Sequence, residues 1–462
     1  MYSVIAIKEW RMMLRSHTLT TAMFSAALLL LIAFVGALKT YRTENDQRNA
    51  ANRHFRHEWA HQHASDAHGA AHFGTYIFKP PTPLSQFDRG LNNFTGNNMR
   101  VEAHIRHTMA IPPLGPADVY LRFGELTPAT VLQLFFPLLL IFLCYNSNAQ
   151  EMNNGTIRLM IVQGISPRKL LMSKAILFSI LAFTLVFITL FICLPLIFHL
   201  PVDTGHYILL ACYACYCCIF VFISISISAI VGNPRKSLLL ILSIWLCWNI
   251  LLPRLAAAAG STRYLLPDIQ AMQTAINQEL KSGINGDDPR DKRMHRLEQA
   301  TLSKYRVKDI TMLPVNFEAI RLQAEEDYAQ QVYDKYAAAV DSIIRKQNAV
   351  TQYAAFADPF LAIRSISMAI CGTDYEHHFA FDTAARNYRN DFIRKLNNAM
   401  LINQPIDSSF FAAMPAFKQQ YPSTTSTVLR QWPFLLSLFF WLIISISLLK
   451  LSARYVPYAQ LR

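Results

Sequence analysis

Six stretches of the chain are apolar over enough consecutive positions to cross a lipid bilayer as helices. About 20 helical residues, each rising about 1.5 Å, span the roughly 30 Å hydrocarbon core of a bilayer. The predicted transmembrane segments are 19–38, 127–145, 175–199, 207–231, 237–253 and 432–450. The first segment is too long for a cleaved signal peptide, and no small-residue cleavage site follows it at Lys39. We therefore expect it to remain in the protein as an anchor.

Two long inserts, 39–126 and 254–431, separate these apolar segments. The first insert is rich in Pro and Gly after His72, which predicts loops with a little strand. The second has Pro and Asp or Asn before amphipathic stretches, which predicts helices. Its longest helix would reach about 50 Å.

An apolar stripe along this longest helix favours packing on neighbouring helices over a groove for a partner protein. The stripe consists of Phe317, Ile320, Ala324, Tyr328, Val332, Tyr336, Val340 and Ile343. The shorter amphipathic stretch 358–372 is expected to lie along the membrane surface.

The composition agrees with a membrane protein, because 53% of the residues are hydrophobic and only 16% are charged. The cysteines lie almost entirely in the apolar segments, so we expect no structural disulfide. Ser224 and Ser228 share one face of the fourth segment and are expected to pack against another helix. The predicted fold is an all-α polytopic membrane protein. Its six transmembrane helices carry a large, mainly helical extracytosolic domain built from the two inserts.

The formal net charge of +13 is concentrated in the short connections and at the two ends of the chain. Because Lys and Arg accumulate on the cytosolic side, segments 1–18, 146–174 and 451–462 are predicted to be cytosolic. Both termini then face the cytosol and both inserts lie outside it. The basic charge therefore reports membrane topology and does not predict a nucleic-acid partner. No charged residue lies deep in any predicted segment, which disfavours an ion-coupled carrier.

The connection 146–174 contains a short predicted helix that begins at Gly155 and Thr156. Ile157, Met160 and Ile161 would form its apolar side. From these residues alone, an ordinary capped linker and a helix that docks on a cytosolic partner are equally compatible with the pattern.

At this point the chain resembles the permease subunits of ABC-2-type transporters. Their coupling-helix loop is similar to the pattern formed here by Glu151, Gly155, Thr156, Arg158, Ser166, Pro167 and Arg168, with Lys174 entering the next segment. Their N-terminal elbow helix is similar to IKEWRMMLRSH, which contains Trp10, Arg11 and Arg15.

The large inserts resemble those of a bacterial subgroup whose external region is catalogued as a domain of unknown function. The similar motifs are AAHFGTYIFKPPTPLSQFDRG, VEAH, GTDYEHHFAF and ARNYRNDF. The resemblance covers essentially the whole chain and implies a multi-pass protein of the bacterial inner membrane.

This resemblance implies a separate cytosolic ATPase subunit that binds ATP and Mg and docks on the coupling-helix loop and the elbow helix. It also implies a second permease, either another copy or a paralogue, contact with membrane lipid, and export or force transmission to an extracytosolic partner protein. The chain lacks a G-x-x-x-x-G-K-[ST] phosphate loop, since GNPRKS has no second glycine, so we expect no ATPase activity in the chain itself. No catalytic residue and no bound cofactor are expected in it.

His57, Glu58 and His61 form an H-E-x-x-H pattern, which defines an alternative class of function, a membrane-anchored zinc-dependent hydrolase. The longer metzincin pattern would need Gly at 64 and His at 67, and both positions are Ala. A more distant carboxylate such as Glu102 would have to supply the third ligand, and no local pattern supports this.

The histidines of this segment also permit regulatory or adventitious metal binding, because spacings of three and four place several on one helix face. The candidates are His54, His57, His61, His63, His68 and His72. We favour a solvated helix that continues from the first transmembrane segment, without a resident metal.

Overall fold

The computed structural model describes residues 2–107 and 126–456. Within this part, six helices are long and apolar enough to cross a membrane. They are Thr18–Ala60, Pro128–Asn153, Pro167–Phe198, Thr204–Val231, Pro234–Arg263 and Trp432–Tyr455. Each predicted transmembrane segment lies inside one of these helices or extends beyond it by at most one residue. The chain is an all-α polytopic membrane protein, as the hydrophobic pattern predicts.

Some spans are single helices and others change geometry along their length. The first, fourth and sixth are α2 (Thr18–Ala60), α11 (Thr204–Val231) and α21 (Trp432–Tyr455). The second contains α5 (Pro128–Thr130), η2 (Val131–Phe135), α6 (Phe136–Cys144) and α7 (Ala149–Asn153). The third contains α9 (Pro167–Phe187), η3 (Ile188–Cys193) and α10 (Leu194–Phe198), and the fifth contains α12 (Pro234–Leu246), η4 (Cys247–Leu251) and α13 (Leu252–Arg263).

The elements η2, η3 and η4 are wide π-helical turns, and each one is followed within two residues by a proline. The prolines are Pro137, Pro195 and Pro253. Proline has no N–H to donate and its ring crowds the carbonyl of the preceding turn, so the helix widens before it. Three spans therefore carry a local departure from α-helical geometry.

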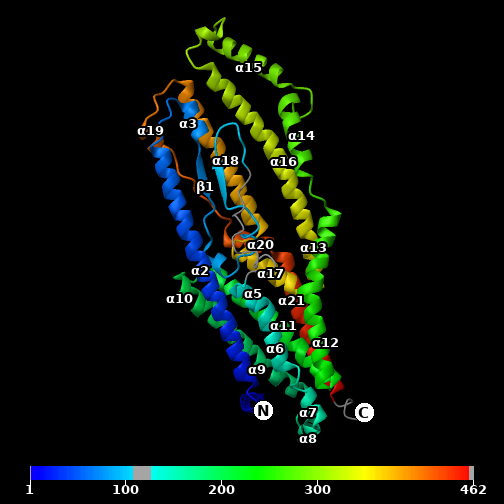
Figure 1. Cartoon of the computed structure of the whole chain (residues 1–462). Coiled ribbons are helices and arrows are strands. Elements are labelled where there is room, and N and C mark those ends of the chain that lie inside the picture. The colour runs from blue at the N-terminus through cyan, green and yellow to red at the C-terminus, as the bar shows by residue number, and fades with distance from the viewer. Residues whose placement is uncertain (1, 108–125, 457–462) are drawn as a thin grey trace.

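Figure 1 shows the two inserts together as one distal domain at one end of the bundle, with α1 (Tyr2–Arg15) and α8 (Thr156–Val162) at the other end. The first insert supplies α3 (Ala67–Phe73), β1 (Thr75–Phe78), η1 (Pro83–Gln86) and β2 (Asn98–Val101). The second supplies α14 (Ile269–Ser282), α15 (Arg290–Tyr305), η5 (Ile310–Met312), α16 (Phe317–Ala355), α17 (Pro359–Ile370), α18 (Tyr375–Leu401), α19 (Ser408–Ala413) and α20 (Thr424–Arg430).

The first insert contains the small amount of strand that its composition predicts. β1 and β2 pair antiparallel, with Thr75 opposite Val101 and Phe78 opposite Asn98. The remainder of its described part is helix, short 3-10 helix, turn and irregular coil, with an isolated β-bridge between Val101 and Arg106.

The long helix α16 packs against α13, α14 and α18, so the predicted packing on neighbours is confirmed. Asn316 caps it by accepting a hydrogen bond from the backbone of Glu318, and Asp268 caps α14 in the same way from Ala271. At Gly260 of α13, a Cβ atom would lie 3.2 Å from the carbonyl oxygen of Gln347 on α16. The absence of a side chain at Gly260 therefore lets the two helices approach closely.

The expected position of 358–372 along a membrane surface is wrong, because α17 lies inside the protein. It contacts α11, α16 and α21, and Ala362 and Ile363 are fully buried. The amphipathic pattern predicts one polar and one apolar side, but it does not show that neighbouring helices cover most of the surface of α17.

Two hydrophobic cores, one in the bundle and one in the distal domain, are joined by α2. Ala33, Phe34 and Ala37 of this helix are buried in the region of the bundle, whereas Trp59 belongs to the distal core and donates a hydrogen bond from Nε1 to the carbonyl oxygen of Phe411. The 43 residues of α2 correspond to about 65 Å of continuous helix. The distal domain is thus built on an extension of the first span.

A buried hydrogen-bond network forms a second connection between the distal domain and the bundle. Ser367 of α17 donates to Oδ2 of Asp88 at 2.5 Å, and Tyr213 of α11 donates to Ser367 at 2.9 Å. Gln133 of η2 donates to the Tyr213 hydroxyl at 2.7 Å. These four side chains come from both inserts and two spans, and a satisfied buried network of this kind fixes their relative positions.

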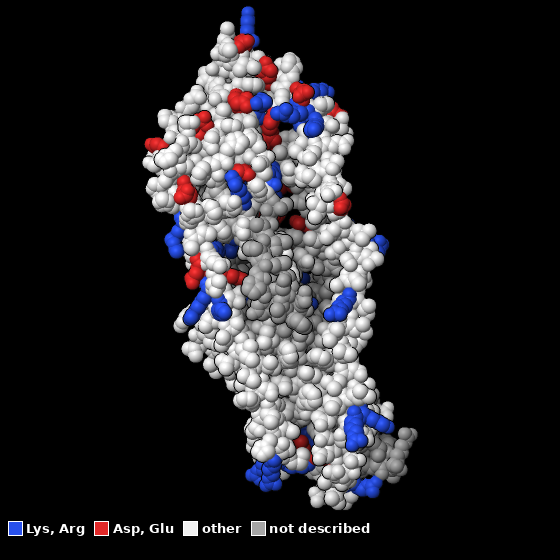
Figure 2. Space-filling view, in the orientation of Figure 1, with Lys and Arg blue, Asp and Glu red and all other residues white. Residues whose placement is uncertain are grey.

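The charge distribution on the surface distinguishes the distal domain, the bundle and the opposite end of the molecule. Figure 2 shows charged side chains over the distal domain and at the opposite end, with a band between them that is almost free of charge on this face.

The cysteines are all unpaired, as their positions in the apolar segments predict.

The role of α2 in the distal core is tested by Trp59→Ala. Loss of a buried tryptophan should destabilise the domain by about 3–5 kcal/mol, because the cavity and the lost apolar contacts add. Protease resistance of the distal domain in the purified full chain measures this effect. Trp432→Ala is the matched control, since Trp432 is 63% exposed and should leave the resistance unchanged. Equal protease resistance in both variants would contradict the assignment.

Candidate functional site

The helix α1 lies against the bundle through one face formed by Ile5, Glu9 and Met13. These residues are spaced four apart, so they line one side of the helix, and Glu9 is only 2% exposed. Trp10, Arg11 and Arg15 lie on the exposed part of α1. A carboxylate on the buried face requires a positively charged partner.

That partner is Lys174 of α9, whose side chain is fully buried. Its Nζ atom lies 3.1 Å from Oε1 of Glu9 and donates to Oε2 of Glu151 at 2.7 Å. Lys8 of α1 also donates to the Glu151 carboxylate, and Lys174 donates to the carbonyl oxygen of Ser147. Two cations and two carboxylates thus form a neutral ion cluster that joins α1, α7 and α9.

The ion cluster, defined here as Lys8, Glu9, Glu151 and Lys174, is held by compensation of charge. Burial raises the pKa of Glu9, and the charge of Lys174 opposes this effect. Removal of one member would leave an uncompensated buried charge, which typically costs about 3–5 kcal/mol.

The connection between the second span and α8 is also anchored by Ser228 of α11. Its hydroxyl donates to the carbonyl oxygen of Tyr145 at 2.7 Å and accepts from the backbone of Ala149 at 3.0 Å. Ser224 and Ser228 are both fully buried, in agreement with their predicted role in helix packing. The start of the loop is therefore fixed to the fourth span.

The helix α8 presents one apolar side to the protein and another to solvent. Ile157 is fully buried, whereas Leu159 is 63% exposed and Val162 is 81% exposed. Gly155 precedes the helix with a φ of 72°, a left-handed conformation that glycine adopts without a steric cost. The hydroxyl of Thr156 donates to the carbonyl oxygen of Glu151, which ties the helix to α7.

The loop ends at the start of α9, where Ser166 accepts a hydrogen bond from the backbone of Lys169 and Pro167 occupies the first turn. Arg168 lines a groove of about 660 Å³ between α9 and α21, together with Lys450 and Arg454 of α21.

The structure thus brings the sequence-predicted coupling residues to one end of the molecule, around α7, α8 and the start of α9. Gly155, Thr156, Arg158, Ser166 and Arg168 are exposed and Pro167 is partly exposed. Glu151 differs, because its carboxylate is buried in the ion cluster. Lys8 and Glu9 belong to the site although no motif in the sequence marks them. The one sequence signal is an acidic residue, Glu9, on the apolar face of an amphipathic helix.

The H-E-x-x-H residues lie in the last turn of α2 and just after it. The rings of His57 and His61 stack with centroids 4.1 Å apart, and Glu58 is half exposed. Glu102, the carboxylate considered as a third ligand, instead pairs with Arg100 at 2.7 Å and with His107.

A group of His/Cys/Asp/Glu side chains with spacing suited to a metal does occur in the described residues. It consists of His68 and His72 of α3 and His104, which follows β2, without His57 or His61. Of the six candidate histidines, His68 and His72 thus lie in this group, whereas His54, His57, His61 and His63 do not.

Comparison with known families decides the class of the protein. A family model described as "ABC-2 family transporter protein" matches residues 3–290. The chain belongs to the ABC-2 transporter family. A second model, "Domain of unknown function (DUF3526)", matches residues 269–420, which lie in the second insert. No curated protein and no solved structure matched the chain.

Membership in the ABC-2 family makes this chain a membrane permease of an ABC transporter and places the ATPase, in general, in a partner subunit. The match to residues 3–290 includes α1, α7, α8 and α9, and therefore all four members of the ion cluster. The distal domain therefore combines the first insert, which lies within the first match, with the second insert, which contains the second match.

The ion cluster is tested by a double-mutant cycle in the full chain. Glu151→Gln and Lys174→Met should each lower thermal stability strongly, because each leaves a buried charge without its partner. The double variant should lose less stability than the sum of the two single losses.

Lys169→Met is the matched control for this cycle, since Lys169 lies on the same helix but is exposed. Additive losses in the cycle would show that the two side chains do not interact.

Proposed function

We propose that this chain is the permease subunit of an ATP-driven transporter in which a separate cytosolic ATPase moves the distal domain. ATP and Mg are bound by that ATPase, and a second permease, a copy or a paralogue, completes the membrane unit. The observation that carries the proposal is the arrangement of α8, which exposes apolar side chains while its other side is anchored to the bundle.

The exposed side of α8 is the proposed docking surface. Leu159 and Val162 project from a helix that begins five residues after Glu151 of the ion cluster. Apolar side chains of an amphipathic helix bind well in a hydrophobic groove of a partner. Gly155, Thr156 and Arg158 lie at the start of the same helix and would form the edge of the contact.

Glu151 contributes to coupling from inside the protein. Since its carboxylate joins α7 to α1 and α9, a displacement of α8 is transmitted to the elbow helix and the third span. Its proposed role is to position the loop and not to touch the ATPase.

Movement of the bundle would reach the distal domain through two rigid connections. One is α2, which enters both hydrophobic cores, and the other is the buried network of Asp88, Gln133, Tyr213 and Ser367. This architecture favours force transmission to the distal domain, and through it to an extracytosolic partner, over simple export through a polar pathway.

The proposed orientation in the bacterial inner membrane has both termini and α8 in the cytosol and the distal domain outside. The excess of Lys and Arg at the α1 and α8 end supports it. Within the described residues, both α1 and the last turn of α21 lie at this end (Figure 1).

The docking surface is tested by the paired substitution Leu159→Asp and Val162→Asp. Two charges on the apolar side should abolish co-purification of the ATPase, because the groove of the partner cannot solvate them. The melting temperature of the isolated permease should not change, since both positions are exposed.

Ile269→Asp in α14 serves as the control, because Ile269 is also apolar and 77% exposed but lies in the distal domain. Retention of the ATPase by the α8 variant, or equal loss with Ile269→Asp, would refute the docking surface.

The orientation is tested by labelling in a variant without native cysteines. A membrane-impermeant maleimide added outside spheroplasts should label Asp287→Cys, which lies between α14 and α15, and should not label Gln163→Cys until the membrane is opened. Both positions are exposed, so access to the reagent differs only through the membrane. The reverse pattern would invert the topology.

A further inference from the structure

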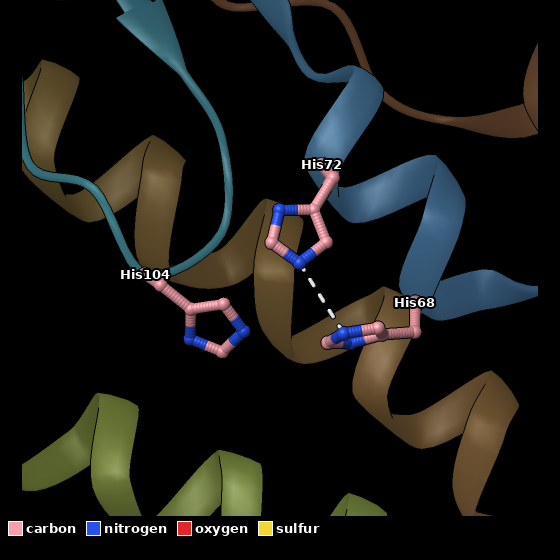
Figure 3. A group of neighbouring side chains, drawn as sticks. All are labelled: His68, His72 and His104. Carbon is pink, nitrogen blue, oxygen red and sulfur yellow. Dashed lines mark hydrogen bonds between the residues drawn. The ribbon is translucent and has the colours of Figure 1, made fainter.

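Three histidine side chains of the distal domain converge on one point. Figure 3 shows His68 and His72 extending from successive turns of α3 towards His104. The ring centroid of His104 lies 5.6 Å from that of His68 and 5.2 Å from that of His72. One ligand nitrogen from each ring falls within 4.8 Å of the other two.

These distances are close to those of a tetrahedral metal site. Zn–N bonds of about 2.0–2.1 Å place two imidazole nitrogens of one site about 3.4 Å apart. The Nε2 atoms of His68 and His72 are already 3.2 Å apart. The ligand nitrogen of His104 lies within 4.8 Å of both, and rotation of its ring would shorten these distances.

The backbone holds the two helical ligands in place. Asp66 caps α3 by accepting a hydrogen bond from the backbone of Gly69 at 2.7 Å. Ala70 and Ala71 on the opposite side of α3 are buried in the distal core. The exposed side of α3, which carries the histidines, is thereby fixed.

His104 is held against α3 by the segment that leaves β2. The neighbouring Ala103 donates its backbone N–H to the carbonyl oxygen of Ala71 at 2.9 Å. His104 itself has a φ of 60°, a left-handed conformation that costs energy for any residue with a Cβ atom. The surrounding contacts maintain this strained backbone and aim the ring at His68 and His72.

Glu326 of α16 lies beside His104, close to the ring nitrogen at which a metal-bound histidine usually has an outer partner. Its Oε1 atom accepts the backbone N–H of His104 at 2.9 Å and lies 3.7 Å from His104 Nδ1. Arg389 donates to both oxygens of the same carboxylate, at 2.8 and 3.2 Å, which fixes its position. A carboxylate near Nδ1 favours the tautomer that leaves Nε2 free for a metal.

We propose that His68, His72 and His104 form a binding site for a divalent transition metal of the zinc class on the distal domain. Three neutral imidazoles match zinc and leave a fourth position for water or a side chain of a partner. Bound zinc ties α3 to the segment after β2, and through Glu326 it connects the first insert to α16. The site is separate from the proposed ATPase-docking surface and does not depend on it.

Zinc binding to the purified full chain, after removal of metals with a chelator, tests this site. Zinc alone should bind at one ion per chain by titration calorimetry. His68→Ala, His72→Ala and His104→Ala should each weaken binding by at least about 100-fold, more than loss of an outer partner usually costs. Cobalt should give the intense visible absorption of tetrahedral coordination in the unmodified chain and lose it in these variants.

The matched controls are His57→Ala and His61→Ala, which remove a pair of nearby histidines with the same spacing. They should bind zinc like the unmodified chain. Absence of stoichiometric zinc binding by the unmodified chain would overturn the proposal, and so would loss of zinc in the controls with retention in the His68, His72 and His104 variants. The melting temperatures of the metal-free variants verify that all of them are folded.

Discussion

The buried ion pair of Glu151 with Lys174 is the interaction on which the proximal end of the molecule depends. Each charge is removed from water, so each is stable only while its partner remains in place. Lys8 and Glu9 extend the pair to the N-terminal helix and keep the cluster neutral. Three elements distant in sequence are thus held together, as the proposed transmission of movement from a partner ATPase requires.

At the opposite end of the bundle, the connections are of a different kind. α2 passes from one hydrophobic core to the other without interruption, and the hydrogen bonds around Asp88 join side chains of both inserts to the spans. The three π-helical turns lie within the second, third and fifth spans, and Gln133 of η2 takes part in this network.

The hydrophobic pattern predicts the six spans because burial in lipid acts on each segment separately. Helix starts such as Asp268, Asn316 and Ser166 are likewise predictable, since a cap depends on residues within one turn. The tertiary contacts are less accessible to this reasoning. Glu9 meets Lys174, and His104 meets His68, only after distant segments pack, and the amphipathicity of α17 does not reveal that neighbours cover its second face. The H-E-x-x-H pattern shows the same limit. Its two histidines, His57 and His61, have the spacing of metal ligands, but the fold of the distal domain brings His104 to His68 and His72 instead.

Hydrogen–deuterium exchange of the permease in complex with its ATPase tests the transmission of movement most directly. Addition of ATP should change exchange in α8 and also in the distal part of α2 and in α3. In the variant that combines Glu151→Gln with Lys174→Met, the ATP-dependent change should be confined to α8. A distal response that persists in this variant, or that is absent from the unmodified complex, would contradict transmission through the ion cluster.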